Sequence, residues 1–211
     1  MADLTLYLLR HGESLANVKR VFAVKKEDLC LSEAGVKEAS GQADLLKTIG
    51  FGCIYTSPLL RARQTANILA QKLNLTVVIS DSLTEVNVGV LDGKSQDSPK
   101  NQALYESVLE EWELGHTNLG FRNGETLTEV ERRLGSFLDD VASKEEKRIL
   151  VIGHCLLFMA VIWLFCENRN PYFEDGHMQR GHLSIIRRSD SQFRLLRFNL
   201  CPKPNVHTNP D

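Results

Sequence analysis

The sequence predicts an α/β protein, a three-layer α/β/α sandwich around a mostly parallel mixed sheet. Short apolar segments rich in strand-forming residues alternate with longer segments whose apolar residues recur at helical spacing. Strands that alternate with helices are typical of domains with a largely parallel sheet. The last two apolar segments follow each other with only a short polar turn between them, which predicts a hairpin.

The first half of the chain predicts three strands and two helices. The strands are the apolar runs 4–9, 53–56 and 76–79. Ser32 carries a hydroxyl suited to cap a helix that extends to Lys47. Ser57 and Pro58 predict the start of the next helix, with the serine as its cap and the proline at the first helical position, where its missing N–H costs nothing. The buried faces of these two helices are predicted to hold Val36, Ala39, Ala43 and Leu46, and Ala62, Ala66, Leu69 and Leu73.

The second half of the chain predicts a long loop, three helices and three strands. Residues 80–98 are rich in Asp, Ser and Gly, and loops of this length in compact domains are usually functional. The apolar run 155–166 is too short to cross a bilayer and predicts a buried helix. We expect a single domain over residues 1–201 and a frayed tail over 202–211. The remaining elements are helices over 102–114 and 126–142 and strands over 148–152, 183–187 and 193–198.

The composition excludes several classes of protein. The 211 residues carry 25 Lys and Arg against 27 Asp and Glu, a formal net charge of −2, so the basic excess of a typical nucleic-acid-binding protein is missing. The five cysteines include no C-x-x-C pair, which argues against a disulfide framework or a zinc ribbon. Polar residues interrupt the first apolar segment, so no signal peptide is recognisable. We expect a cytoplasmic protein without a nucleic-acid or membrane partner, and the oligomeric state is left open.

Two of the predicted strands end in a histidine. Arg10 and His11 follow the first strand, and Gly153 and His154 follow the fourth. In open α/β sheets the ligand crevice lies beyond the carboxyl ends of the strands, so we expect both imidazoles at one site. Arg61 would bring a guanidinium and a helix N-terminus to the same edge, and both suit phosphate oxygens. Taken singly, these residues are equally compatible with ordinary strand-end and surface positions.

Five motifs stand in order along residues 4–160, namely RHGE at 10–13 with Asn17, SPLLRARQTA at 57–66, LTEVNVGVLDG at 83–93, NGETL at 123–127 with Arg133, and VIGH at 151–154. A single motif such as Arg-His-Gly arises often by chance, whereas five in this order are specific. Together they resemble the histidine phosphatase superfamily, which includes cofactor-dependent phosphoglycerate mutases, fructose-2,6-bisphosphatases and many small phosphomonoesterases. The resemblance is to the small phosphatase branch.

The resemblance implies a role for each matched residue. His11 matches the nucleophile that accepts the phosphoryl group as a phosphohistidine, and a neutral imidazole is a competent nucleophile at pH 7. Glu85 matches the carboxyl group that protonates the leaving alkoxide and then takes a proton from the attacking water. The family mechanism requires no metal and no cofactor, because arginines supply the positive charge. The residues expected around the phosphoryl group are Arg10, Gly12, Asn17, Arg61 and His154, of which Arg10, Arg61 and His154 are also expected to act in catalysis.

Several further residues are secondary candidates. Cys155 follows His154 where many relatives have a small residue, so its thiol is either inert packing or a group that crowds the phosphate. Asp92 is a weaker candidate for a proton donor. Four basic residues are either solvated or positioned to meet a second negative group on the substrate, namely Lys19, Arg20, Lys25 and Lys26. Three histidines are expected in solvated loops, namely His116, His177 and His207.

The sequence therefore predicts a metal-independent phosphomonoesterase that acts on a small phosphorylated metabolite. The span between Gly93 and Gly124 is only 30 residues, too short for the long insertion that closes a mutase site, and an open site favours hydrolysis. A phosphoglycerate mutase-like phosphotransferase is the alternative, and a catalytically weak phospholigand-binding protein is the alternative from another class. A metallohydrolase is disfavoured because the sequence has no closely spaced ligand pair such as His-x-x-x-His; its candidate ligands would be His11, Glu13, Asp92 and His154.

Overall fold

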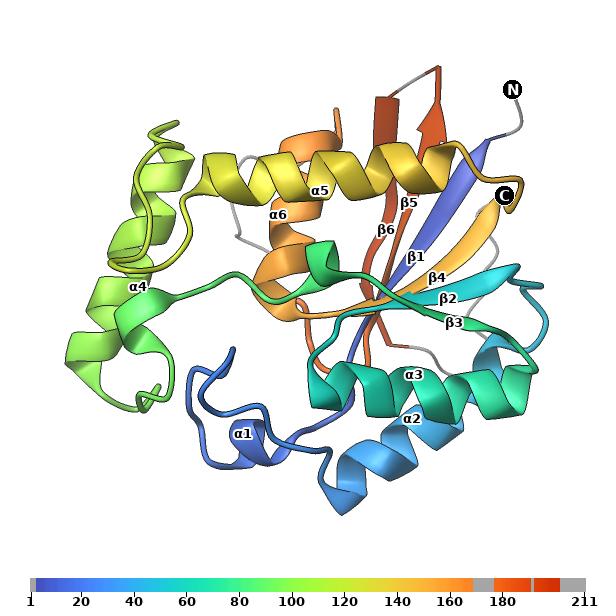
Figure 1. Ribbon diagram of the computed structural model, residues 1–211, viewed down its shortest axis with the longest axis horizontal. Coiled ribbons are helices and arrows are strands. Elements are labelled where there is room, and N and C mark those ends of the chain that lie inside the picture. Colours follow the sequence, from blue (N-terminus) through green and yellow to red (C-terminus); the bar gives the residue numbers. More distant parts are fainter. Residues whose placement is uncertain (1–2, 169–176, 191, 202–211) are drawn as a thin grey trace.

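The computed structural model describes residues 3–168, 177–190 and 192–201. A six-stranded mixed sheet runs through its middle in the strand order β3-β2-β4-β1-β5-β6 (Figure 1). The predicted tail over 202–211 lies outside the described residues. The strands are β1 (Leu4–Arg10), β2 (Cys53–Thr56), β3 (Val77–Ile79), β4 (Arg148–Gly153), β5 (Leu183–Ser189) and β6 (Gln192–Leu200).

Strand β1 lies between a parallel and an antiparallel part of the sheet. It pairs parallel with β4 and antiparallel with β5. On one side β2 is parallel to both β3 and β4, and on the other side β5 and β6 are antiparallel. The predicted mixed, mostly parallel sheet is confirmed. Because Arg10 pairs with Gly153, β1 and β4 end at the same level, and the chain leaves each of them directly into a histidine.

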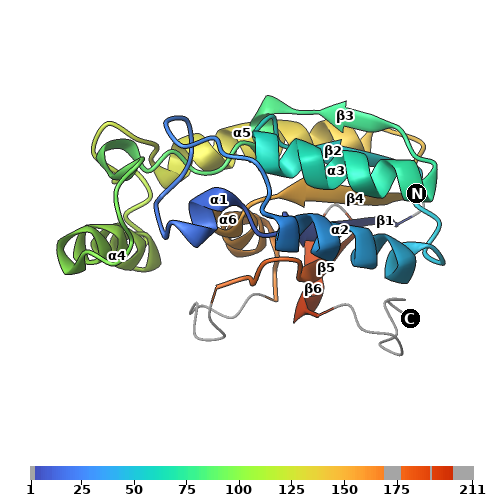
Figure 2. The ribbon, with the colours of Figure 1, turned by 90° about the horizontal axis from the view of Figure 1, so that it is seen from below.

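Helices cover both faces of the sheet, which confirms the predicted three layers (Figure 1 and Figure 2). Residues of α2 and α3 form the core on one face, and residues of α5 and α6 form it on the other. Helix α4 stands apart from the sheet (Figure 1). The helices are α1 (Leu15–Val18), α2 (Glu33–Leu46), α3 (Leu60–Leu73), α4 (Pro99–Glu113), α5 (Leu127–Ala142) and α6 (Cys155–Phe165), and 3-10 turns occupy Asp81–Leu83 and Gly89–Leu91.

The first strand is buried on both faces. Its side chains alternate between the two cores, with Leu4, Leu6 and Leu8 in the α5–α6 core and Tyr7 and Leu9 in the α2–α3 core. Successive strand side chains point to opposite faces, so a strand covered on both faces appears in the sequence as one continuous apolar run. Each buried leucine contributes roughly 1.5–3 kcal/mol relative to an exposed one. The packing of β1 on both faces therefore fixes the position of the polar residues that follow it.

Helix α3 begins later than the sequence predicts. Its first residue is Leu60, its N-cap is Leu59, and Pro58 lies outside the helix. The prediction that Ser57 caps this helix is wrong. The Ser57 hydroxyl accepts a hydrogen bond from the Leu59 amide over 3.2 Å and also contacts His154. His154, which is distant in the sequence, therefore binds the side chain predicted to cap the helix.

The prediction of the buried face of α2 is wrong at one position. Ala39, Ala43 and Leu46 are fully buried, whereas Val36 is 45% exposed. Gly35 takes the buried position, since a Cβ added there would lie 2.1 Å from the carbonyl oxygen of Glu13. The helix therefore packs against the loop after β1 through a residue without a side chain, and Val36, one position further round the helix, points away.

Candidate active site

A cavity of about 340 Å³ lies at the carboxyl ends of β1 and β4. Parallel strands deliver their following loops to the same edge of a sheet, which is why residues from four distant segments meet there. The segment after β1, the start of α3, the loop that contains Glu85 and the start of α6 all contribute to its wall. Of the predicted site residues, those that line the cavity are Arg10, His11, Asn17, Arg61 and Glu85.

The imidazole of His11 is buried and held in one orientation. Its Nδ1 lies 2.7 Å from the carbonyl oxygen of Gly12, so Nδ1 carries the proton and donates to that oxygen. The other ring nitrogen, Nε2, accepts a hydrogen bond from Nε of Arg61 over 3.1 Å. With only 3% of the residue exposed, this arrangement leaves the Nε2 lone pair directed toward the arginine-lined part of the site.

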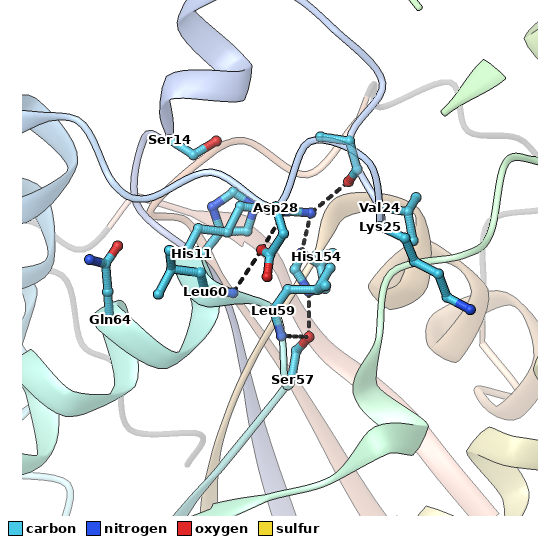
Figure 3. A network of polar contacts seen from close by, with 12 residues as sticks. His11, Ser14, Val24, Lys25, Asp28, Ser57, Leu59, Leu60, Gln64 and His154 are labelled. Carbon is cyan, nitrogen blue, oxygen red and sulfur yellow. Dashed lines mark hydrogen bonds and ion pairs between the residues drawn. The ribbon is translucent and has the colours of Figure 1, made fainter. Parts of the chain in front are cut away.

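His154 lies beside His11 and is tied to the start of the α3 segment (Figure 3). The two ring centroids are 5.2 Å apart at an interplanar angle of 62°. Nδ1 of His154 lies 3.3 Å from Nη2 of Arg61 and accepts from it, so Nε2 is the protonated nitrogen and donates to the Ser57 hydroxyl over 2.7 Å. Arg61 therefore bridges the two imidazoles.

Both arginines bring buried donors to the site. Arg61 is 3% exposed, donates from Nη2 to the Ala23 carbonyl over 2.8 Å and places Nη1 3.8 Å from Oδ1 of Asp28. Asp28 also accepts from the Leu60 amide, which links this contact to the first residue of α3 (Figure 3). Nη1 of Arg61 and Nε of Arg10 are buried without a hydrogen-bond partner among the described residues. Buried donors without a hydrogen-bond partner are rare, so these two are candidate donors to an anionic ligand.

The surroundings lower the pKa of both histidines well below its usual value of 6.5. Burial is the main cause, because the charged imidazolium would lose its hydration, and the positive charge of Arg61 adds to the effect. Both rings are therefore neutral at pH 7. A neutral His11 retains the lone pair on Nε2 that a nucleophile needs.

Glu85 lies on the cavity wall at the N-terminus of α6. One carboxylate oxygen accepts from the amides of Val86 and Leu157, each over 2.9 Å, and the other accepts from the amide of Leu156 over 3.3 Å. Unpaired amides at a helix N-terminus suit a carboxylate, and they hold it in place. The loop that contains Glu85 and the strand-end loop that contains His154 thus meet through the first turn of α6.

Of two residues predicted to bind the phosphoryl group, Asn17 lines the described cavity and Gly12 does not. Asn17 lines the cavity, but its Oδ1 accepts from both the amide and the hydroxyl of Ser14, each over 3.0 Å, so its Nδ2 is the group left for a ligand. Gly12 is not part of the described cavity wall. Its amide donates to the Thr65 hydroxyl over 3.3 Å, and a Cβ at this position would lie 2.6 Å from the Gly35 carbonyl. Close packing against α2 is the reason for glycine here.

Asp92 anchors a loop and does not line the cavity. It is 5% exposed, and its carboxylate accepts from the amides of Val24, Lys25 and Lys26 over 2.8 to 3.0 Å. The same loop provides the Ala23 carbonyl that holds Arg61. Asp92 therefore supports the arginine through the backbone, and its position does not fit the weaker proton-donor role.

The four basic residues expected near a second negative group do not line the described cavity. Lys19 pairs with Glu27 over 3.4 Å, and Arg20 pairs with Asp97 across the exposed surface. Lys25 and Lys26 contribute backbone amides to Asp92, as described above. Surface ion pairs of this kind contribute little to the free energy of unfolding. They hold the charged groups of Lys19 and Arg20 at the protein surface, outside the described cavity wall.

The cavity wall also includes Tyr105, which the sequence analysis did not single out, together with His177 and Cys155. Tyr105 of α4 lines the cavity, and burial raises the pKa of its hydroxyl well above 10. His177 also lines it; it is exposed and lies outside the helices and strands, as expected for a solvated loop histidine, and His116 lies on the surface beside Glu111. Burial raises the pKa of Cys155 to about 11, which favours a protonated, unreactive thiol. The amphipathic pattern of α4 was a signal for Tyr105; His207 lies outside the described residues.

The described residues contain no group of three or more His, Cys, Asp or Glu side chains that could hold a metal ion. The four residues considered for a metallohydrolase are not gathered, because Glu13 binds the Ser32 hydroxyl over 2.8 Å and Arg180 over 3.1 Å. Across 3–168, 177–190 and 192–201, no helix is long and apolar enough to cross a membrane.

Two kinds of sequence comparison relate the chain to known proteins. A family model of the histidine phosphatase superfamily (branch 1) matches residues 6–200. Proteins named "Probable phosphoglycerate mutase GpmB" from Yersinia pestis (strain Pestoides F) and Yersinia pseudotuberculosis (strain YPIII) are 34% identical over 138 residues. This match spans 64% of the chain and 62% of the length of those relatives.

Solved structures share the fold over nearly the whole chain. The alpha-ribazole phosphatase from Shigella flexneri is 20% identical with a TM-score of 0.77, and the similarity covers 97% of this chain and all of that one. The mycobacterial glucosyl-3-phosphoglycerate phosphatase is 24% identical with a TM-score of 0.79, covering 93% and 98%. These structures show that the fold is shared, and the family model over residues 6–200 shows that the chain belongs to the histidine phosphatase superfamily.

Proposed function

We propose that this chain is a metal-independent phosphomonoesterase that hydrolyses a small phosphorylated metabolite through a phosphohistidine at His11. The observation that carries the proposal is the Nε2 atom of His11, which is unprotonated, buried and 3.1 Å from a guanidinium that has a further unused donor. A neutral nucleophile next to fixed positive charge is the arrangement that phosphoryl transfer needs.

In the first step, the Nε2 lone pair of His11 forms a bond to phosphorus while the bond from phosphorus to the alcohol oxygen breaks. The leaving alkoxide takes a proton from the carboxyl group of Glu85, which lines the same cavity. In the second step, Glu85 accepts a proton from water as the water oxygen attacks phosphorus and the bond to Nε2 breaks. General acid and base assistance of this kind is worth about 10²–10⁴-fold.

The donors around His11 would bind the phosphoryl oxygens. Nε of Arg10 and Nη1 of Arg61 have no competing hydrogen bond among the described residues, and Nδ2 of Asn17 adds a neutral donor. His154 is fully buried behind the described cavity wall and would act on the phosphoryl group through Arg61, which it holds by its Nδ1. Donors that are already in place in a buried site need no reorganisation during the reaction, which is the main source of their effect.

A phosphoglycerate mutase-like phosphotransferase is the second candidate, and the name of the Yersinia relatives favours it. The short span between Gly93 and Gly124 supports hydrolysis instead, because a mutase must shield its phosphohistidine from water. A phospholigand-binding protein without turnover is the third candidate.

The test is to incubate the purified chain and its His11→Ala variant with a set of phosphorylated metabolites and to measure released phosphate. We expect hydrolysis by the wild type, acid-labile phosphate on the quenched protein, and neither with His11→Ala. His116→Ala, which changes an exposed histidine, is the matched control and should behave as the wild type. Full activity of His11→Ala, or activity abolished by a chelator, would overturn the mechanism. Isomerised 3-phosphoglycerate without free phosphate would identify a mutase, and tight binding without turnover a binding protein.

A further inference from the structure

Part of the cavity wall is apolar. Six described residues from the loop after α1, the 80–98 segment, α4 and α6 form this wall, namely Val21, Phe22, Val88, Tyr105, Leu109 and Leu156. Since the two arginines mark the phosphoryl end, this wall faces the alcohol part of the ester.

Tyr105 forms a flat surface in this wall. Its ring lies 5.2 Å from that of Phe22 at 35°, and 5.7 Å from that of Phe121 in a stacked arrangement at 26°. Both neighbours are buried, with at most 7% exposed, so the ring is held in position. Burial raises the pKa of its hydroxyl, Cys155 and Glu85 add to this, and Arg10 opposes it.

The described residues of this wall provide no positive charge for a second anion. The arginines and histidines among the described residues that line the cavity are Arg10, His11, Arg61 and His177. The two arginines belong to the phosphoryl end, and desolvation together with Arg10 lowers the pKa of His177, so that this ring is neutral at pH 7. The other polar groups on this side are the amides of Gln96 and Gln102 and the carboxylate of Glu106.

We propose that the substrate is a phosphate monoester whose alcohol part is uncharged and presents a flat apolar face to Tyr105, with the phosphate as its only anionic group. This rests on the proposed phosphatase function. An apolar group gains by leaving water against this wall. A carboxylate or second phosphate would lose its hydration there without a counter-charge and would face Glu106.

The test compares three alkyl phosphates with the wild-type chain, so that the leaving groups are all alcohols. Benzyl phosphate has an uncharged aromatic group and glycerol 3-phosphate an uncharged polar one. In 3-phosphoglycerate a carboxylate replaces the terminal hydroxymethyl group of glycerol 3-phosphate. We expect kcat/KM to fall by about tenfold at each step, the discrimination typical of one apolar contact or one uncompensated polar group. Equal or higher kcat/KM for 3-phosphoglycerate than for glycerol 3-phosphate would overturn the proposal.

Two pairs of variants assign the effect to this wall. Tyr105→Ala should remove most of the advantage of benzyl phosphate over glycerol 3-phosphate, whereas Tyr105→Phe should retain it. If Tyr105→Ala fails to fold, Leu109→Ala provides the same readout. Glu106→Lys should raise kcat/KM for 3-phosphoglycerate relative to glycerol 3-phosphate about threefold, the size expected of one solvent-exposed charge. Glu110→Lys, the same change on α4 outside the described cavity wall, should leave that ratio unchanged.

These results separate the present inference from the proposed function. If all three esters are hydrolysed only when His11 is present but the order is reversed, the substrate class is wrong and the phosphatase function holds. If His11→Ala hydrolyses the esters as fast as the wild type, the proposed function itself fails. If a folded Tyr105→Ala or Leu109→Ala variant still prefers benzyl phosphate over glycerol 3-phosphate, this wall does not cause the preference.

Discussion

The Nε atom of Arg61 donates a hydrogen bond to Nε2 of His11 over a distance of 3.1 Å. The nitrogen proposed to attack phosphorus therefore accepts a hydrogen bond from this guanidinium. In the proposed mechanism, an entering phosphate would take over this donor, which would free the lone pair and bring positive charge to the phosphoryl oxygens. Arg61 would thus both hold the nucleophile and bind the group that it attacks.

This double role predicts a large effect of Arg61→Lys. A lysine keeps the charge but cannot contact His11, His154 and the phosphoryl group at once, because it lacks the planar fork. We expect kcat/KM to fall by about 10²–10³-fold, the usual effect of removing one fixed donor to the transition state. Steady-state kinetics with a phosphate ester would measure this. Arg63→Lys, an exposed position on the same helix, should change little, and a similar loss there would point to a general effect on α3.

The lowered pKa of His11 predicts activity that persists below pH 6.5. Its causes are burial first and then Arg61 and Arg10. Arg10→Gln should therefore move the acid limb of the kcat/KM profile to higher pH, because removing a positive charge makes protonation of His11 easier. A pH–rate profile of both proteins, corrected for the second ionisation of the substrate phosphate near pH 6, would show this shift. An acid limb that does not move would mean that another group controls it.

The lowered pKa values of His11 and His154 predict that the free energy of unfolding falls in acid. His11 and His154 both have a folded-state pKa below 6.5, so below that pH the unfolded chain binds more protons than the folded one. The free energy of unfolding therefore has its full value above about pH 6.5 and declines as the pH falls below it. Urea unfolding at pH 7.5 and 5.5 should show a smaller difference for His154→Gln than for the wild type. The exposed His116→Gln should retain the wild-type difference.

Glu85→Gln distinguishes a proton donor from a structural carboxylate. An amide oxygen can still accept from the α6 amides, so the fold should be retained, but no proton can be delivered to the leaving oxygen. We expect a loss of about 10²–10⁴-fold for alkyl phosphates. The loss should be much smaller for 4-nitrophenyl phosphate, whose leaving group needs little protonation. Equal losses with both esters would assign Glu85 to structure alone.

Asp92→Asn should weaken the loop that holds Arg61. The carboxylate accepts from three backbone amides, and an asparagine would keep only part of this set. We expect a loss of about 1–3 kcal/mol in the free energy of unfolding, measured in urea, together with a higher KM. Asp97→Asn alters an exposed ion pair with Arg20 and should cost little. An unchanged stability of Asp92→Asn would contradict the anchoring role.

Much of the architecture was predictable because local patterns carry it. Both faces of β1 are covered, so the strand is a continuous apolar run, and the stripe of Ala62, Ala66 and Leu69 indicates the buried face of α3. The parallel pairing of β1 with β4 brings His11 and His154 to one edge, which the strand ends suggested. Motif spacing supported the family, and the match over residues 6–200 agrees with it.

The sequence by itself determined the order of strands and helices, the buried faces apart from Val36, and the meeting of Arg10, His11, Arg61 and Glu85 at the carboxyl edge. Periodicity and chain direction decide these features locally. The tertiary structure alone decided what each polar group binds. Ser57 holds His154 instead of capping α3, Asp92 holds a loop instead of lining the cavity, and Tyr105 forms a cavity wall. These contacts join residues far apart in the chain, and a hydrogen-bond partner at such separation depends on how whole layers pack, which no local spacing records.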